Sequence, residues 1–251
     1  MAGSRSLLDE ALPTLGKALL IEDCVETSGG FLLHHLVKRF LLCDRPVILV
    51  AFANTFSHYD RILRKLGCNL AAPRDKNRFV FVDMLDPQLQ VGNSGGTDGS
   101  ADGDVGFSLY ERICKAVRSI STEKNSVAIL VDDLSLMEVA CKGSVDDVID
   151  FLHHCHTLIA ESDCSFVFLN HHDIYSSMER PSLMLYLEYM ADVLLRVEPL
   201  ATGSAVDVHG QLTVLNRGVH DVAGTSRSKF QNFHYRVKEN GIECFYPGSR
   251  G

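Results

Sequence analysis

The sequence contains no tryptophan, no C-x-x-C pair and no apolar run long enough to span a bilayer. Its eight cysteines are not spaced as redox or metal pairs, and most stand among apolar neighbours, as Cys43, Cys114 and Cys155 do. This usage indicates a reducing intracellular compartment in which cysteines act as small hydrophobic residues. The start of the chain leads into an amphipathic segment with Asp9 and Glu10, so we expect no signal peptide.

Three catalytic signatures are also missing. The chain has no complete G-x-x-x-x-G-K-[ST] phosphate loop, no G-x-S-x-G nucleophile elbow at the junction of an expected strand and helix, and no G-x-G-x-x-G dinucleotide fingerprint. Positive charge is scarce as well, because 24 Lys and Arg face 32 Asp and Glu, which gives a net charge of -8. This balance argues against a chain built alone to neutralise a nucleic-acid backbone.

The composition that is present is ordinary for a globular protein, with 46% apolar and 22% charged residues over 251 positions. This length is sufficient for one substantial core, and we expect a single domain over residues 1–251. Residues 88–104 differ, because their sequence is rich in Gly, Ser and Asp and offers nothing to bury. We expect them to form a flexible loop inserted into that domain.

Apolar runs and helix-period segments alternate along most of the chain. The expected strands cover residues 18–23, 47–52, 79–83, 127–133 and 165–170. Their continuous apolar character is typical of parallel strands buried on both faces. The sequence therefore predicts an α/β fold in which helices cover both faces of a mostly parallel sheet.

The last part of the chain predicts an antiparallel extension of that sheet. Two further strands are expected at 193–197 and 211–215, followed by a hairpin with Asn240-Gly241 as its two-residue turn. That turn would pair Val237 with Cys244. Upstream, the spacing of Ser108 and Glu111 predicts a capping box at the start of a helix.

The opening unit of strand, small polar loop and helix has the layout of a phosphate-binding loop. With Gly29 as the second glycine of that motif, Cys24 stands at the first glycine, Gly30 at the lysine and Phe31 at the hydroxyl. The lysine normally reaches the terminal phosphates, and the hydroxyl holds magnesium. The chain is therefore predicted to keep a nucleotide-binding architecture without nucleotide chemistry, and to need no cofactor.

Paired carboxylates, Asp132 and Asp133, end the fourth expected strand, where nucleotide-hydrolysing enzymes keep a magnesium ligand. A polar strand end facing solvent is the simpler interpretation. Without a phosphate-binding lysine, a magnesium carboxylate has little to hold. We therefore interpret these residues as a solvated strand end or a relic.

Histidines occur in two groups. His153 and His156 share one face of a helix, and zinc could use that spacing. His171, His172 and Asp173 follow the fifth strand, at the end where open α/β sheets usually carry sites. Because neither group has a second cluster of complementary spacing, no metal site is predicted.

Two small basic groups are the remaining candidates for a binding surface. They are Arg74, Lys76 and Arg78, and Arg112, Lys115 and Arg118. Groups of this kind are more often solvated faces than RNA sites.

Several segments together resemble the sixth-subunit family of the Elongator complex. They are residues 27–35 (TSGGFLLHH), 56–59 (FSHY), 65–67 (KLG), 130–135 (LVDDLS), 200–203 (LATG) and 207–212 (DVHGQL). They run in order from Thr27 to Leu212, and the closing hairpin fits the same domain. The insert near Gly92 has no counterpart in the resemblance.

The resemblance implies a RecA-like fold without catalytic nucleotide motifs, and so a pseudo-ATPase rather than an enzyme. It implies a six-membered ring with the fourth and fifth Elongator subunits, two copies of each, joined through the ring to the remaining core subunits. The ring would bind transfer RNA and support modification of the wobble uridine, U34. The location implied is the cytoplasm, with the nucleus as a second compartment because Elongator is also linked to RNA polymerase II.

Two alternatives stay open. The first is an active RecA-like ATPase with a divergent phosphate loop. It needs a substitute for the missing lysine, and the nearest candidate, Lys38, lies roughly two helical turns away. The second is an autonomous RNA-binding module, which the net acidity and the lack of an aromatic-basic stripe disfavour.

Overall fold

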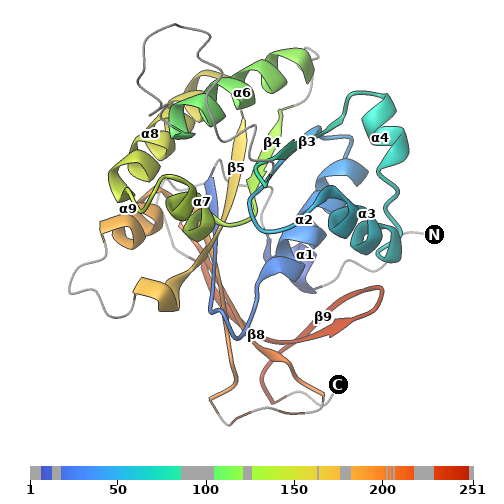
Figure 1. Ribbon diagram of the computed structural model, residues 1–251. Coiled ribbons are helices and arrows are strands. Elements are labelled where there is room, and N and C mark those ends of the chain that lie inside the picture. Colours follow the sequence, from blue (N-terminus) through green and yellow to red (C-terminus); the bar gives the residue numbers. More distant parts are fainter. Residues whose placement is uncertain are drawn as a thin grey trace, which may run out of the picture. The chain divides into compact units, whose positions relative to one another are not determined.

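The computed structural model describes residues 7–12, 18–85, 105–120, 126–162, 164–175, 182–201, 203, 205, 207–217 and 229–248 (Figure 1). The chain divides into two compact units, one of residues Met1–His35 with Leu169–Gly251 and one of residues Leu36–Phe168. The single domain over 1–251 stays a prediction, and the expected insert at 88–104 lies outside the described residues.

The unit of residues Leu36–Phe168 is built on parallel strands. Its strand order is β3-β2-β4-β5, with every neighbouring pair parallel. The strands are β2 (Val47–Ala51), β3 (Phe79–Asp83), β4 (Ala128–Val131) and the first part of β5 (Ser165–His171). All residues of β2 and β4 are buried, as their continuous apolar runs predict.

Helices alternate with these strands along the sequence. They are the later part of α2 (Gly30–Leu42), then α3 (Phe56–Lys65), α4 (Ala71–Asp75), α6 (Val105–Ile120), α7 (Leu134–Ala140) and α8 (Val145–Ser162). Helix α3 ends just before Gly67, whose φ of 80° is the left-handed conformation that favours glycine. Helix α8 begins after Ser144, whose Oγ accepts a 3.2 Å hydrogen bond from the Asp147 N–H.

The unit of residues Met1–His35 and Leu169–Gly251 combines parallel and antiparallel pairing. Strands β1 and β6 are parallel, and β6, β7, β8 and β9 then follow one another as antiparallel neighbours. Its elements are α1 (Leu7–Ala11), β1 (Ala18–Asp23), the 3-10 turn η1 (His172–Tyr175), α9 (Ser182–Met190), β6 (Val193–Glu198), β7 (Gly210–Asn216), β8 (Lys229–Lys238) and β9 (Gly241–Phe245). The α/β fold with mainly parallel strands and an antiparallel C-terminal extension is thus confirmed.

Two local predictions were wrong. The hairpin turns at Glu239 and Asn240, and Tyr235 rather than Val237 lies opposite Cys244. The shift is two residues along β9, so each side chain keeps its face, and the buried Tyr235 and Cys244 become neighbours. The expected capping box also fails, because α6 begins at Val105 and places Ser108 inside the helix.

Within the described part of the chain, no helix is long and apolar enough to cross a membrane.

Candidate functional site

The loop between β1 and α2 is held by its own backbone and by one short side chain. The Thr27 N–H donates to the Cys24 carbonyl at 2.9 Å, and the Gly30 N–H donates to Ser28 Oγ at 3.2 Å. Gly29 is buried, and a Cβ at this position would lie 2.9 Å from Ile21 Cγ2. The expected second glycine of the loop is therefore required by close packing on β1.

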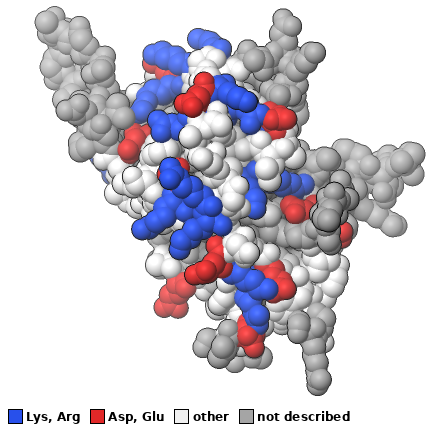
Figure 2. All heavy atoms as spheres, turned by 90° about the vertical axis from the view of Figure 1, so that its right-hand side faces the viewer, with Lys and Arg blue, Asp and Glu red and all other residues white. Residues whose placement is uncertain are grey.

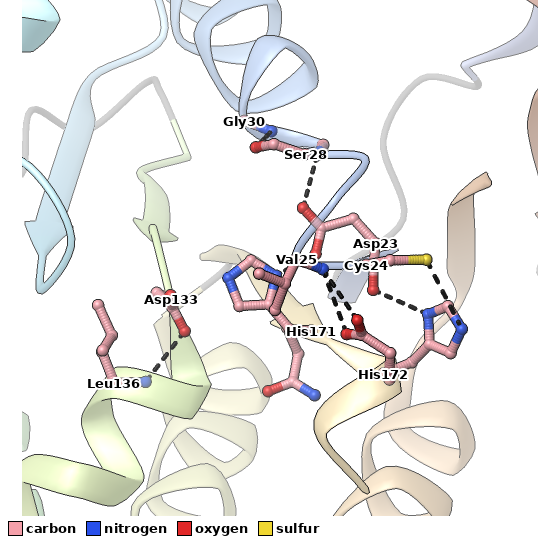
Figure 3. A network of polar contacts seen from close by, with 12 residues as sticks. Asp23, Cys24, Val25, Ser28, Gly30, Asp133, Leu136, His171 and His172 are labelled. Atoms are coloured by element: carbon pink, nitrogen blue, oxygen red, sulfur yellow. Dashed lines mark hydrogen bonds and ion pairs between the residues drawn. The ribbon is translucent and has the colours of Figure 1, made fainter. Parts of the chain in front are cut away.

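The carboxylate of Asp23, the last residue of β1, lies against this loop (Figure 3). It is fully buried, and its Oδ2 accepts a hydrogen bond from the Gly29 N–H at 2.5 Å. Its Oδ1 contacts His171 Nδ1 at the end of β5. In a working phosphate loop, backbone N–H groups of this kind cradle phosphate oxygens. Here one of these groups, the Gly29 N–H, already donates to the Asp23 carboxylate.

Two residues that follow β5, His172 and Asp173, contact the chain at and just after Asp23. The ring of His172 donates from Nδ1 to the Asp23 carbonyl oxygen at 2.8 Å, which leaves Nε2 facing the Cys24 sulfur at 4.0 Å. The Val25 N–H donates to both carboxylate oxygens of Asp173, at 3.3 and 3.1 Å.

A thiol beside a histidine suggests a nucleophile, but the electrostatics oppose it. Burial raises the pKa of the Cys24 thiol, and the nearby carboxylates of Asp173 and Asp23 raise it further. Reactive cysteines need the opposite environment, in which neighbouring positive charge stabilises the thiolate. Cys24 is therefore held in its neutral form and is unsuited to nucleophilic catalysis.

The positions of the missing lysine and hydroxyl are used for helix initiation and packing. Gly30 is the first residue of α2 and has no side chain to reach a phosphate. Phe31 lies against Tyr235 of β8, with ring centroids 4.7 Å apart and an interplanar angle of 30°. An aromatic contact thus stands where magnesium chemistry requires a small hydroxyl.

Asp132, which follows β4, is surrounded by donors from its own unit. It accepts hydrogen bonds from the Phe52 N–H at 2.6 Å, from the Ala53 N–H at 3.2 and 3.1 Å, and from the Tyr59 hydroxyl at 2.6 Å. Burial raises the pKa of Asp132 to about 6, although the hydrogen bonds from Tyr59, Phe52 and Ala53 each lower it. The carboxylate joins the end of β2 to α3.

Asp133 serves a different local purpose. Its Oδ1 accepts a 3.0 Å hydrogen bond from the Leu136 N–H, so it is the N-cap of α7. Asp132 and Asp133 are 5% and 4% exposed, so this strand end is buried and does not face solvent as the simpler interpretation had it. Both oxygens of Asp132 and the Oδ1 of Asp133 thus already accept hydrogen bonds from groups of the chain itself.

The two histidine groups lie in different surroundings. His153 and His156 are exposed on α8, whereas His171 and His172 contact the Asp23 side of the loop. No group of three or more His, Cys, Asp or Glu side chains within the described ranges is arranged to hold a metal ion.

Sequence reasoning missed Asp23, although it did place His171 and His172 at a strand end. The available signal was a pair of acidic residues, Glu22 and Asp23, that ends an apolar run directly before a small polar loop. The partner of Asp23 is 148 residues further along the chain, and only the fold brings the two together. Next to it, the buried Glu22 pairs with Arg196 of β6 at 2.7 Å, another contact that the sequence did not suggest.

A comparison with solved structures shows the fold. A KaiC-like protein from the hyperthermophilic archaeon Pyrococcus horikoshii superposes with a TM-score of 0.60 at 12% identity, covering 91% of this chain and 89% of that one. This likeness to a RecA-like protein agrees with the fold class expected from the sequence.

Sequence comparisons identify relatives over nearly the whole chain. Elongator complex protein 6 of Homo sapiens is 29% identical over 245 residues, which covers 93% of this chain and 91% of that protein. The protein of the same name from Danio rerio is 26% identical, with 97% and 96% covered, and that from Dictyostelium discoideum is 22% identical, with 94% and 91% covered. The family model described as Elongation complex protein 6 matches residues 6–239, and the chain belongs to this family.

Proposed function

We propose that this chain is a non-catalytic accessory subunit of Elongator, which forms a hetero-hexameric RecA-like ring with the fourth and fifth subunits. The ring would bind transfer RNA and support modification of wobble uridine U34. The observation that carries the non-catalytic part is the buried Asp23 carboxylate on the Gly29 N–H. The loop that would hold a phosphate thus already donates a hydrogen bond to a carboxylate of the same chain.

Electrostatics support this assignment. A nucleotide phosphate placed at this loop would meet the Asp23 carboxylate at close range, and no lysine at position 30 would compensate it. Expelling Asp23 would leave a buried charge without its donor and would break the contact with His171. A bound anion would therefore have to compete with the Asp23 carboxylate for the Gly29 N–H.

The alternative of an active ATPase finds little support in these contacts. It would need a cation near the loop and a free carboxylate for magnesium. Lys38 lies eight residues beyond Gly30 on α2, roughly two turns away. Asp132 already accepts from Phe52, Ala53 and Tyr59. We therefore propose that ATP turnover is absent.

The partner assignment rests on family membership. The relatives are named as Elongator complex proteins, and the RecA-like fold commonly has two flanks that can contact neighbours in a closed ring. We propose that the remaining core subunits are reached through the ring. We place the chain in the cytoplasm, with the nucleus as a second compartment where a link to RNA polymerase II transcription would operate.

Phosphate release from ATP tests the non-catalytic assignment. The purified chain and its mixture with the fourth and fifth subunits should both stay at the background rate. Gly30→Ala is the matched control, since it changes the loop without touching Asp23. Turnover above background that falls in Gly30→Ala would favour the active ATPase.

Size-exclusion chromatography with light scattering tests the assembly. The chain mixed with the fourth and fifth subunits should give a particle with two copies of each. Fluorescence anisotropy with labelled transfer RNA at two salt concentrations should show salt-sensitive binding by this particle, and much weaker binding by the isolated chain. Tight binding by the isolated chain that partners do not change would favour the autonomous RNA-binding module.

A further inference from the structure

We propose that the surface formed by α3, α4 and the entry to β3 binds the phosphodiester backbone of RNA. We call this surface the basic face. It consists of Arg61, Arg64, Lys65, Arg74, Lys76 and Arg78. The proposal deepens the proposed function, on which its RNA partner rests, because it names where this chain would touch RNA. Figure 2 shows Lys and Arg side chains gathered over this side of the chain.

Charge is distributed very unevenly along the sequence. Between Phe56 and Arg78 there are six Lys and Arg side chains and only two acidic ones, Asp60 and Asp75, whereas the whole chain has a net charge of -8. A positive segment in an acidic protein is not explained by solubility, since the rest of the chain supplies that charge. Such an asymmetry is the usual electrostatic sign of a polyanion partner.

The fold brings together residues that the sequence presents as separate. Phe56, the first residue of α3, lies under Arg74, whose guanidinium carbon is 4.5 Å from the ring centroid. Arg61 and Lys65 are four residues apart on α3 and so occupy neighbouring positions on one side of it. The contact between Phe56 and Arg74 places α4 beside the start of α3, and both helices lie on the side of the chain that Figure 2 faces.

Part of this charge is neutralised within the chain, and part is not. Arg64 pairs with Asp60 at 2.9 Å, and Arg78 pairs with Asp44. Arg61, Lys65 and Lys76 are exposed, and none of them lies within ion-pair distance of an acidic side chain among the residues that the structure describes. These three charges are available to a partner without breaking an existing contact.

The chemistry of the face favours a nucleic-acid backbone over stacked bases. Four of its six cations are arginines, whose planar guanidinium groups donate two parallel hydrogen bonds to a phosphate. The aromatic ring within it, Phe56, is covered by Arg74 and is not a platform for a base. We therefore expect contact with structured RNA that is independent of base sequence and strongly weakened by salt.

The test compares two pairs of charge removals in the same unit. Arg61→Gln with Lys65→Gln removes two charges from the basic face. Lys115→Gln with Lys142→Gln is the control, and it removes two exposed charges from the same unit, one on α6 and one in the turn after α7, neither of them among the six of the basic face. Glutamine keeps a long polar side chain with good helix propensity, so both variants should fold, and circular dichroism checks this.

The readout is binding of a labelled transfer RNA transcript over a series of salt concentrations. It is measured for the full chain at low salt and for the assembled ring. In both, the basic-face variant should reduce the slope of log K against log salt by roughly 1.4 to 1.8 for each copy of the chain that contacts the RNA, because each lost phosphate contact contributes about 0.7 to 0.9. The control variant should leave the slope unchanged.

Three outcomes would overturn the proposal: equal losses for both variants, no loss for the basic-face variant, or no RNA binding by chain or ring at low salt. A glutamate-rich peptide that binds this face while RNA does not would assign it to an acidic protein partner instead. A ring that assembles and binds RNA unaffected by Arg61→Gln with Lys65→Gln would reject the basic face while leaving the proposed function intact. Failure of the ring to assemble would count against the proposed function alone. RNA binding by the full chain at low salt would still test the basic face in that case.

Discussion

Among the buried aspartates at strand ends in the described part of the chain, Asp132 and Asp23 are satisfied in different ways. Asp132, after β4, accepts only from neutral donors, namely two backbone N–H groups and the Tyr59 hydroxyl. Asp23, at the end of β1, accepts from one backbone N–H and contacts a histidine from a distant part of the sequence. Each carboxylate occupies donors that a nucleotide or its metal-bound water could otherwise use.

Under the proposed non-catalytic function, the comparison illustrates how a nucleotide-binding architecture could lose its chemistry while its strand-end carboxylates stay buried. A charged group at such a position is costly unless its oxygens are hydrogen-bonded. Once the ligand is lost, internal donors can take its place, and the carboxylates then contribute to the fold. The four predictions below test this in order of expected size.

Removal of Asp132 should have the largest effect. Asp132→Ala leaves the Phe52 N–H, the Ala53 N–H and the Tyr59 hydroxyl buried without an acceptor, so we expect a loss of about 4 kcal/mol in the free energy of unfolding. Tyr59→Phe removes a single donor and should cost about 1 kcal/mol. Urea denaturation measures both, and equal losses for the two variants would contradict the account.

Removal of Asp23 should come next. Asp23→Ala leaves the Gly29 N–H and His171 without their partner, and we expect about 3 kcal/mol of destabilisation by urea denaturation. Glu26→Ala, in the exposed part of the same loop, is the control and should stay within about 0.5 kcal/mol. The variant should still bind no ATP, since Gly30 and Phe31 are unchanged. ATP binding gained by this single change would show that Asp23 alone closes the site.

The pH dependence of stability tests the burial of Asp132. Burial raises the pKa of Asp132 from 3.8 to about 6, so the folded state holds this proton more tightly than the unfolded state does. This contribution is complete below about pH 3.8 and is lost as the pH rises through 6. Between pH 4.5 and 7 it should decrease by about 2 kcal/mol. Carboxyl carbon NMR of Asp132 should show a midpoint near pH 6, and a midpoint near 4 would contradict the burial argument.

The smallest effect is expected at the glycines of the loop. Gly29→Ala places a Cβ 2.9 Å from the Ile21 side chain, which is fully buried and cannot move away, so we expect a loss of about 1 to 2 kcal/mol. Gly30→Ala brings its Cβ no closer than 3.4 Å to Ser28 Oγ and should be neutral or slightly stabilising. Thermal unfolding of the pair measures the difference, and a Gly30→Ala variant that is as unstable as Gly29→Ala would show that close packing is not the reason.

The sequence predicted most of the fold because local patterns determine it. Continuous apolar runs located β2 and β4, and the small polar loop before α2 was placed correctly. The role of Asp23 could not be predicted, because it depends on a histidine 148 residues away. The hairpin register was missed because Asn240-Gly241 is a favourable turn by composition, whereas burial of Tyr235 opposite Cys244 decides the pairing. The basic face was seen only in part, because α3 and α4 are separate in sequence.

The contact between Phe31 and Tyr235 has an evolutionary consequence. A single substitution that restored a threonine at position 31 would recreate a magnesium-binding hydroxyl, but it would also remove a ring that packs on β8. Phe31 is only half-buried, so replacing its ring by a small side chain should cost less than the roughly 3 to 5 kcal/mol typical of a core phenylalanine. A threonine at position 31 would therefore cost packing without restoring catalysis, because Gly30 still stands at the lysine position. Under the proposed non-catalytic function, the packing of Phe31 on Tyr235 would oppose the return of a magnesium ligand at this position.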